Sequence, residues 1–150
     1  IAGAPSLPTS FYNPFLNDKV QLINNRTYDL LKISDLALVT SGTATLETAI
    51  FNVPQVVCYK AGNVSYQIAK RVIKVNYISL VNIIMDKEVV KELIQDDLNS
   101  NQLQIQMNAL LNNQQVRNEV FNDYRLLKDI LGKGGASKKI ATSMLKTLKW

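Results

Sequence analysis

Hydroxyl groups and one glycine gather in the segment SDLALVTSGTATLETAIFNVPQVVCY (34–59), whose predicted helix carries one carboxylate. Ser41, Gly42 and Thr43 follow an apolar run that predicts a buried strand, and they precede a pattern that predicts a helix. In a parallel α/β sheet, ligands bind beyond the carboxyl ends of the strands, where a helix start attracts anions. Gly42 lets a phosphate approach the backbone closely, and Glu47 follows about 6 Å further along the helix. The spacing suits a nucleoside diphosphate, with its phosphates at the helix start and its ribose hydroxyls at the carboxylate.

The same residues also fit a purely structural interpretation. A serine or threonine often caps the start of a helix, and Thr45 with Glu47 forms a weak variant of the capping pattern. The spacing alone leaves both interpretations open.

Polar residues recur in a second segment, YISLVNIIMDKEVVKELIQDD (77–97). Asn82 is expected in a loop that follows an apolar run. Glu88, Glu92 and Gln95 then recur at helical spacing, with Glu88 near the expected helix start, where the dipole favours a carboxylate. This helix either contributes to a site or presents an ordinary solvated face.

The chain of 150 residues contains no histidine and a single cysteine, Cys58. The absence of histidine excludes Ser-His-Asp and Cys-His catalysis within this chain and removes the commonest transition-metal ligand. Any chemistry must therefore rest on carboxylates, hydroxyls, amides, basic side chains and helix ends. Cys58 lies in an apolar run, so we expect it to pack in the core.

The net charge of +5 comes from residues 117–150, because residues 1–116 are neutral. A basic tail is typical of a polyanion partner, an anionic membrane surface or a solvated helix face. The tail has few aromatic residues and no recognised nucleic-acid-binding pattern, so we expect no nucleic-acid partner. No apolar run approaches the roughly 18 residues that span a bilayer.

Apolar runs alternate with amphipathic segments along much of the chain. The predicted strands lie at 1–4, 20–23, 36–39 and 55–59, and the predicted helices at 27–34, 44–51, 65–74, 86–95, 100–112, 114–131 and 137–150. This order predicts a doubly wound parallel α/β sheet followed by a helical tail. We expect one domain, with an α/β part over 1–97 and a helical tail over 98–150. The opening IAGAPSLPTSFY has neither an initiator methionine nor a leader pattern, so we expect the chain to begin inside a larger fold.

Three stretches, taken in order, resemble the lipid-A-disaccharide synthase family: SDLALVTSGTATLETAIFNVPQVVCYK, IAKRVIKVNYISLVNII and KEVVKELIQDD. The family pattern contains an SGTATLE corner, a PQVV-Y-[RK] strand, an AKR helix, a YISL-N segment and a KELLQ helix. The resemblance is strong over residues 28–97 and looser in the flanks. Lys60 and Val81 depart from the pattern, which commonly has an arginine and a proline there. Lysine keeps the charge of arginine but loses its bidentate fork.

The resemblance implies that the chain is the C-terminal, UDP-binding half of a GT-B glycosyltransferase, an enzyme built from two Rossmann-like halves. Such an enzyme transfers diacylglucosamine from UDP-diacylglucosamine to the 6-hydroxyl of diacylglucosamine 1-phosphate. The resemblance implies no cofactor and no catalytic metal. It places the catalytic base in the N-terminal half, so it implies no catalytic residue in this chain. It also implies a cytoplasmic enzyme that is peripheral at the inner face of the bacterial inner membrane.

The resemblance also assigns roles to both groups of polar residues. The residues that it implies for UDP binding are Ser41, Gly42, Thr43, Thr45 and Glu47. Those that it implies for the sugar side of the cleft are Asn82, Glu88 and Gln95. The helix start would stabilise the departing UDP.

Basic residues on one predicted helix, Lys70, Arg71 and Lys74, are expected to face an anionic membrane or phosphate groups. The expected partners are the two lipid substrates, the membrane surface and the N-terminal half of the same enzyme, and a homodimer is an open alternative to a monomer. Two other interpretations remain open at this stage. One is a different UDP-sugar enzyme of the GT-B type, and the other is a helical interaction or nucleic-acid-binding module.

Overall fold

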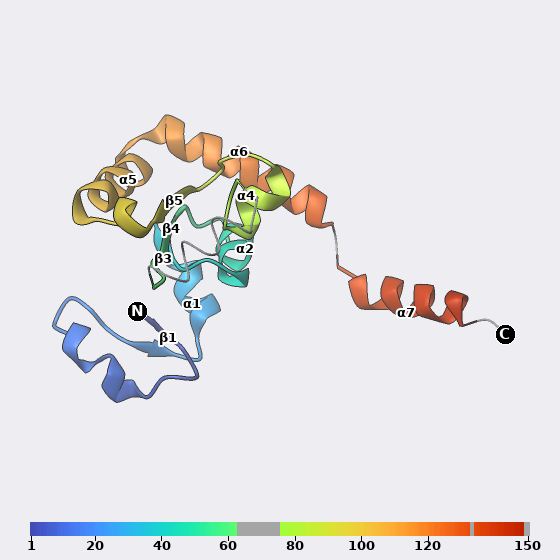
Figure 1. Cartoon of the computed structure of the whole chain (residues 1–150), viewed down its shortest axis with the longest axis horizontal. Helices are drawn as coiled ribbons and strands as arrows, with labels where there is room; N and C mark the ends of the chain where they lie inside the picture. The colour runs from blue at the N-terminus through green and yellow to red at the C-terminus, as the bar shows by residue number, and fades with distance from the viewer. Residues whose placement is uncertain (63–75, 133, 149–150) are drawn as a thin grey trace.

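A three-stranded parallel sheet, in the order β3-β4-β5, lies at the centre of the computed structural model, which describes residues 1–62, 76–132 and 134–148 (Figure 1). The strands are β3 (Ala37–Val39), β4 (Gln55–Tyr59) and β5 (Lys91–Ile94). Val57 of the middle strand pairs with Val39 of β3 and with Glu92 of β5. The first three residues of β4 are buried, as expected for a parallel strand that is covered on both faces.

Helices cover both faces of this sheet. They are α2 (Thr43–Ile50), α4 (Leu80–Met85), α5 (Ser100–Asn112) and α6 (Gln114–Leu131). The α5 helix contacts β4 and β5, whereas α2 contacts β3 and β4 and also packs against α4 and α6. Figure 1 shows α5 on one side of the strands and the α2–α4 pair on the other. The fold is therefore α/β and Rossmann-like, as the sequence predicts.

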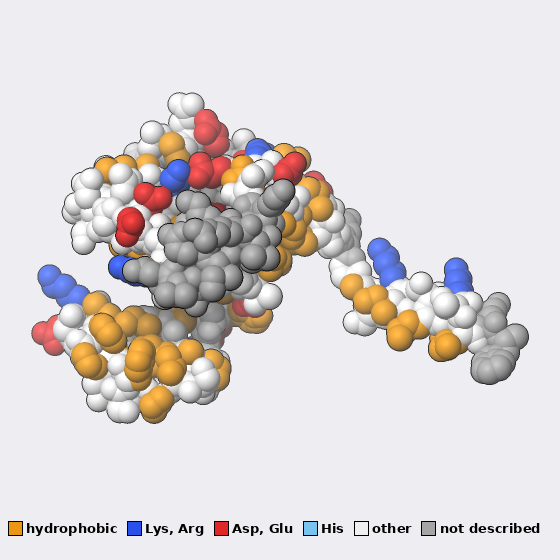
Figure 2. All heavy atoms as spheres, viewed as in Figure 1, with side chains coloured by type: hydrophobic (Ala, Val, Ile, Leu, Met, Phe, Trp, Pro, Cys, Tyr) orange, Lys and Arg blue, Asp and Glu red, His pale blue; other side chains and the backbone are white. Residues whose placement is uncertain are grey.

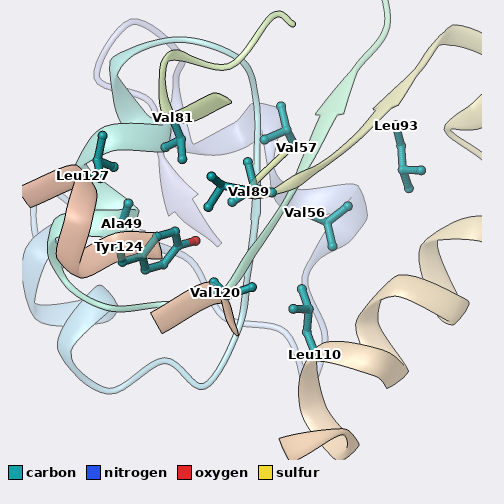
Figure 3. Packing of buried hydrophobic residues seen from close by; sticks show 11 residues of the cluster. Ala49, Val56, Val57, Val81, Val89, Leu93, Leu110, Val120, Tyr124 and Leu127 are labelled. Atoms are coloured by element: carbon teal, nitrogen blue, oxygen red, sulfur yellow. The ribbon is translucent and has the colours of Figure 1, made fainter. Parts of the chain in front are cut away.

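The hydrophobic core joins the sheet to these helices. Its buried members are Ala49, Val56, Val57, Val81, Val89, Val90, Leu93, Leu110, Val120, Tyr124 and Leu127. Figure 3 shows Tyr124 and Leu127 of α6 near Ala49 of α2. The Tyr124 hydroxyl accepts a hydrogen bond from Gln55 Nε2 (3.1 Å) and donates one to the Val53 carbonyl oxygen (3.3 Å). The ring can therefore be buried completely without leaving its polar end unpaired.

A second, smaller parallel pair precedes the main sheet. It consists of β1 (Ala2–Gly3) and β2 (Ile23–Asn24), with the short 3₁₀ helices η1 (Thr9–Phe11) and η2 (Asn13–Phe15) between them. Buried Tyr12 holds this segment together, because its hydroxyl accepts a hydrogen bond from the Ala4 N–H (2.7 Å). The α1 helix (Thr27–Lys32) then leads to β3. The strand predicted over 20–23 overlaps β2 only at Ile23.

The last helix, α7 (Ala136–Thr147), lies apart from the body of the chain (Figure 1). None of its residues is buried. Figure 2 shows apolar side chains along one side of this helix and basic side chains along another. Its exposed apolar residues include Ile140, Met144 and Leu145. Across the described ranges, no helix is long and apolar enough to cross a membrane.

The helix predicted over 86–95 is wrong. Asp86 adopts a left-handed conformation (φ 49°) that ends α4, and the residues from Lys91 to Ile94 form the edge strand β5. Along β5 the buried residue is Leu93, between less buried neighbours, which is the alternation of a strand. The loop predicted at Asn82 is also wrong, since Asn82 lies within α4. The helix predicted over 65–74 falls outside the described residues.

The other predicted elements are confirmed to within a few residues. They are the helices predicted over 27–34, 44–51, 100–112, 114–131 and 137–150 and the strands predicted over 1–4, 36–39 and 55–59. Each carries either a continuous apolar run or an apolar stripe at helical spacing, so the local pattern agrees with the final packing.

Candidate functional site

Three chain segments meet at the carboxyl edge of the main sheet, because parallel strands all end on the same side. They are the corner 40–42 after β3, the segment 60–62 after β4 and Gln95 after β5. The side chains of Thr40 and Lys60 are exposed there. This edge is where ligands bind in doubly wound α/β proteins.

Gly42 forms the turn between β3 and α2 and is the N-cap of that helix. Its backbone has φ 132° and ψ −162°, a region that is essentially restricted to glycine. No side chain caps α2 through a hydrogen bond, so the predicted alternative of a serine or threonine cap is wrong. The N–H groups of Thr43 and Ala44 lie in the first turn, where a helix supplies no partner for them. Both residues are exposed, so the first turn of α2 lies at the protein surface.

Two hydroxyl groups fix the geometry of this corner from inside the protein. Ser41 Oγ donates a hydrogen bond to the Ile78 carbonyl oxygen (2.7 Å), which ties the corner to the segment that precedes α4. Thr45 is completely buried, and its Oγ1 donates to the Gly42 carbonyl oxygen (2.7 Å). Both hydroxyl protons are therefore used within the protein. Glu47 lies one turn further along α2 and is half-buried.

Asn82 joins α4 to the start of β5. Its Nδ2 donates to the Val90 carbonyl oxygen (2.8 Å) and to Glu92 Oε1 (2.8 Å). Its Oδ1 accepts from the N–H groups of Val89 (2.8 Å) and Val90 (2.9 Å). The side chain is completely buried, so all its polar atoms serve this connection.

Gln95 joins the ends of β4 and β5. Its Oε1 accepts from the Ala61 N–H (2.7 Å), and its Nε2 donates to the Ala61 carbonyl oxygen (3.1 Å). The side-chain amide thus pairs with both backbone groups of Ala61, as a neighbouring strand would, and holds the segment that follows β4. The backbone of Gln95 has a left-handed φ of 53°, and Gln95 is buried, with 8% of its surface exposed.

Comparison with known proteins identifies the family. The model of the family described as lipid-A-disaccharide synthetase matches residues 13–143. The chain belongs to this family. The resemblance noted in the sequence is thus confirmed.

Several curated relatives carry the name lipid-A-disaccharide synthase. The protein of Syntrophus aciditrophicus is 39% identical over 130 residues, which cover 87% of this chain and 34% of that protein. The protein of Geobacter sulfurreducens is 34% identical over 129 residues, covering 86% of this chain and 34% of that protein. The protein of Anaeromyxobacter dehalogenans strain 2CP-1 is 32% identical over 150 residues, covering 97% of this chain and 39% of that protein. The chain therefore spans little more than a third of the length of these relatives.

The structure brings together most of the residues that the family resemblance assigns to UDP. Gly42, Thr43 and Glu47 lie at or within one turn of the exposed start of α2, and Ser41 lies just before it. Thr45 belongs to the same corner but has no exposed surface. A phosphate at this corner would thus meet the first N–H groups of α2 and the Thr43 hydroxyl, rather than the hydroxyl of Thr45.

The residues assigned to the sugar side are more dispersed. Gln95 lies at the carboxyl edge of the sheet, where its side chain holds Ala61. Asn82 is buried behind that edge. Glu88 precedes the amino end of β5, where it is exposed and forms an ion pair with Lys91 (3.0 Å). The structure therefore does not bring Glu88 together with the corner, because the helix that was expected to align it with Gln95 is absent.

The remaining groups that could carry chemistry are basic side chains, metal ligands and the thiol of Cys58. Lys70, Arg71 and Lys74 lie outside the described residues. Within the described ranges, no three His, Cys, Asp or Glu side chains lie close enough to hold a metal ion. Cys58 is half-buried against the core, and burial raises the pKa of its thiol. The thiol is therefore kept protonated, as expected for a packing residue.

One important residue was missed by the sequence reasoning. Glu92 accepts hydrogen bonds from the Ile78 N–H (2.9 Å), the Ser79 N–H (2.9 Å) and Asn82 Nδ2. In the sequence, Glu92 is only one of several polar residues at helical spacing, on a predicted helix that either contributes to a site or is solvated. A strand assignment would instead have placed Glu92 and the apolar Leu93 on opposite faces of the sheet.

Proposed function

We propose that the full-length protein transfers diacylglucosamine from UDP-diacylglucosamine to diacylglucosamine 1-phosphate, as a step of lipid A biosynthesis, and that this chain supplies the UDP-binding part. The observation that carries the proposal is the family match over residues 13–143. The exposed, uncapped start of α2 supports it, because this start lies at the ligand-binding edge of a parallel sheet.

The start of α2 offers the chemistry that departing UDP requires. As the glycosidic bond breaks, negative charge develops on the diphosphate. The N–H groups of Thr43 and Ala44, the Thr43 hydroxyl and the positive end of the helix dipole are in place to stabilise that charge. A hydrogen bond to a charged group contributes about 1.5–3 kcal/mol. We expect this transfer to need neither a resident metal nor a cofactor.

Glu47 is proposed to bind the ribose. It follows the helix start by about 6 Å along the axis of α2, a distance that separates a phosphate from the ribose of the same nucleotide. A carboxylate can accept hydrogen bonds from both ribose hydroxyls at once. The catalytic base and most of the acceptor site belong, in this proposal, to the remainder of the protein.

Calorimetric titration of the full-length protein with UDP tests the binding role. We expect UDP to bind more tightly than adenosine or guanosine diphosphate. In Glu47→Gln, the affinity for UDP should fall about tenfold while the melting temperature stays close to that of the parent, because one charge-assisted contact is weakened. Equal binding of the three nucleotides would count against uridine selectivity. A collapsed melting temperature with unchanged UDP affinity would make Glu47 a structural residue of α2.

We also propose that the protein binds an anionic membrane surface, where its lipid substrates lie. The basic excess of residues 117–150 and the exposed lysines of α7 support this proposal. Each basic residue near an anionic surface contributes about 1 kcal/mol, and salt weakens the attraction. We expect co-sedimentation with vesicles that contain anionic lipid at low salt, and less with neutral vesicles. Equal sedimentation with both vesicle types would contradict the electrostatic contribution.

A further inference from the structure

Glu92 of β5 is connected to the nucleotide-binding corner through a single peptide group. This is the peptide group between Ile78 and Ser79: its N–H, that of Ser79, donates to Glu92 Oε1 (2.9 Å), and its oxygen, the Ile78 carbonyl oxygen, accepts from Ser41 Oγ (2.7 Å). Ser41 immediately precedes Gly42, the N-cap of α2. The carboxylate thus fixes the peptide to which the corner is attached.

The same carboxylate fixes the neighbouring peptide and the start of α4. Its Oε2 accepts the N–H of the preceding peptide group, that of Ile78 (2.9 Å), and its Oε1 also accepts Asn82 Nδ2 (2.8 Å). Ser79 is in turn the N-cap of α4, where its side chain accepts the Asn82 N–H (3.3 Å). The segment that receives the Ser41 hydrogen bond is therefore held at two successive N–H groups, one by each carboxylate oxygen.

This pattern of hydrogen bonds requires two acceptor oxygens on one side chain. A glutamine has nearly the same shape as glutamate, but it offers one oxygen and one NH₂ group, which is only a donor. It could accept one of the two backbone N–H groups and would place a donor against the other. The unpaired N–H group would favour a shift of Ile78 and, with it, of Ser41.

We infer that Glu92 is a positioning residue for the UDP site: through the peptide group between Ile78 and Ser79 and through Ser41, it sets the orientation of the Gly42 corner without contacting the nucleotide. This inference rests on the proposed function, because it concerns the affinity of the corner for UDP. In this inference, a residue of β5, one of the two outer strands of the described sheet, determines the geometry of a site that follows β3, the other outer strand.

Titration of full-length Glu92→Gln with UDP tests the inference, with Glu119→Gln as a control. Glu119 is an exposed glutamate on α6 whose carboxylate accepts a hydrogen bond from Gln115 Nε2 (3.1 Å). Its substitution by glutamine also removes one negative charge, but at a position distant in sequence from the corner. We expect about tenfold weaker UDP binding for Glu92→Gln and no change for Glu119→Gln. Unchanged UDP affinity in folded Glu92→Gln would overturn the inference and leave the proposed function intact. No UDP binding by the parent protein would overturn both.

A double-mutant cycle with Ser41→Ala separates positioning from a general structural role. If Glu92 acts through Ser41, the affinity loss in the double variant should be close to that of either single variant. Losses that multiply would show that Glu92 does not act through Ser41 and would overturn the inference. If Glu92→Gln does not fold, the same cycle is measured with Glu92→Asp, which keeps both oxygens on a shorter side chain. Glu92→Asp should bind UDP with an affinity between those of the parent and Ser41→Ala. If Glu92→Asp binds UDP as tightly as the parent, while adding Ser41→Ala to it weakens binding as much as in the parent, the inference is overturned.

Discussion

Gly42 is the residue on which the candidate site depends most directly. Its φ of 132° combined with ψ of −162° is a conformation that other residues adopt only under strain, yet no atom lies within 4 Å of the position where a Cβ would stand. The requirement for glycine is therefore a backbone requirement and not a steric one. The same absence of a side chain leaves the start of α2 open to an approaching phosphate.

We therefore expect Gly42→Ala to lower the free energy of unfolding by about 1–3 kcal/mol and to weaken UDP binding, because the corner must relax toward an allowed conformation. Urea unfolding and UDP titration of the full-length variant measure the two effects. Gly62→Ala is the matched control for stability, since Gly62 also has open space at the Cβ position and does not adopt a left-handed φ. Equal stability of Gly42→Ala and the parent protein would contradict the strain argument.

At the scale of elements, the sequence predicts the central part of the fold where one pattern dominates. The continuous apolar run at β4 fits a buried strand, and the apolar stripe at α6 fits a helix packed on one face. The structure contains both elements. The segment 86–95 contains polar residues at helical spacing together with buried residues at strand spacing, so the local pattern is ambiguous. Pairing with β4 decides it, because Leu93 is then buried and Glu92 can reach the α4 start. That pairing involves distant parts of the chain, which a local pattern does not contain.

The same limit applies to the candidate site. The corner around Gly42 is contiguous in sequence, so its position after a strand and before a helix could be predicted. The contacts of Asn82, Glu92 and Gln95 join separate elements, and the sequence indicated only that these residues are polar. These contacts indicate that the three side chains hold the site together, a role that no spacing rule could distinguish from ligand binding.

The contact between α6 and β4 predicts a loss of stability at high pH. Burial raises the pKa of Tyr124 above the value of about 10 that is usual for tyrosine. The hydroxyl therefore stabilises the fold fully below about pH 10, and this contribution is lost as the pH rises from there toward the folded-state pKa, because the unfolded tyrosine loses its proton first. The free energy of unfolding should fall by up to about 1.4 kcal/mol for each pH unit in that range.

Denaturant unfolding at a series of pH values from neutral to alkaline measures this loss. Tyr124→Phe should reduce the alkaline slope, while costing about 1–3 kcal/mol at neutral pH because Gln55 Nε2 loses one of its two acceptors. Tyr28→Phe is the control, since Tyr28 is 53% exposed and stacks on Phe51 without burial of its ring. An alkaline slope that is the same in Tyr124→Phe and in the parent would show that Tyr124 does not cause the loss.

At the scale of the whole molecule, the chain holds the edge of a sheet that would bind the donor, but it spans little more than a third of its relatives. In the proposed transfer, the acceptor must be held against the anomeric carbon of the donor, and its 6-hydroxyl needs a base. Lost positioning is worth roughly 7–11 kcal/mol, and a lost general base about 10²–10⁴-fold in rate. We therefore expect residues 1–150 alone to catalyse no detectable transfer, even where they bind UDP.

Domain complementation measures this expectation. Residues 1–150 are mixed with a separately expressed fragment that carries the remainder of the full-length protein, and disaccharide formation is assayed with each fragment alone and with both together. Product should appear only in the mixture. Gly42→Ala in the first fragment should lower the rate of the mixture, because in the proposed transfer the corner stabilises the departing UDP in the transition state. Turnover by residues 1–150 alone would place the base and the acceptor site in this chain and would overturn the division of roles between its α2 corner and the rest of the enzyme.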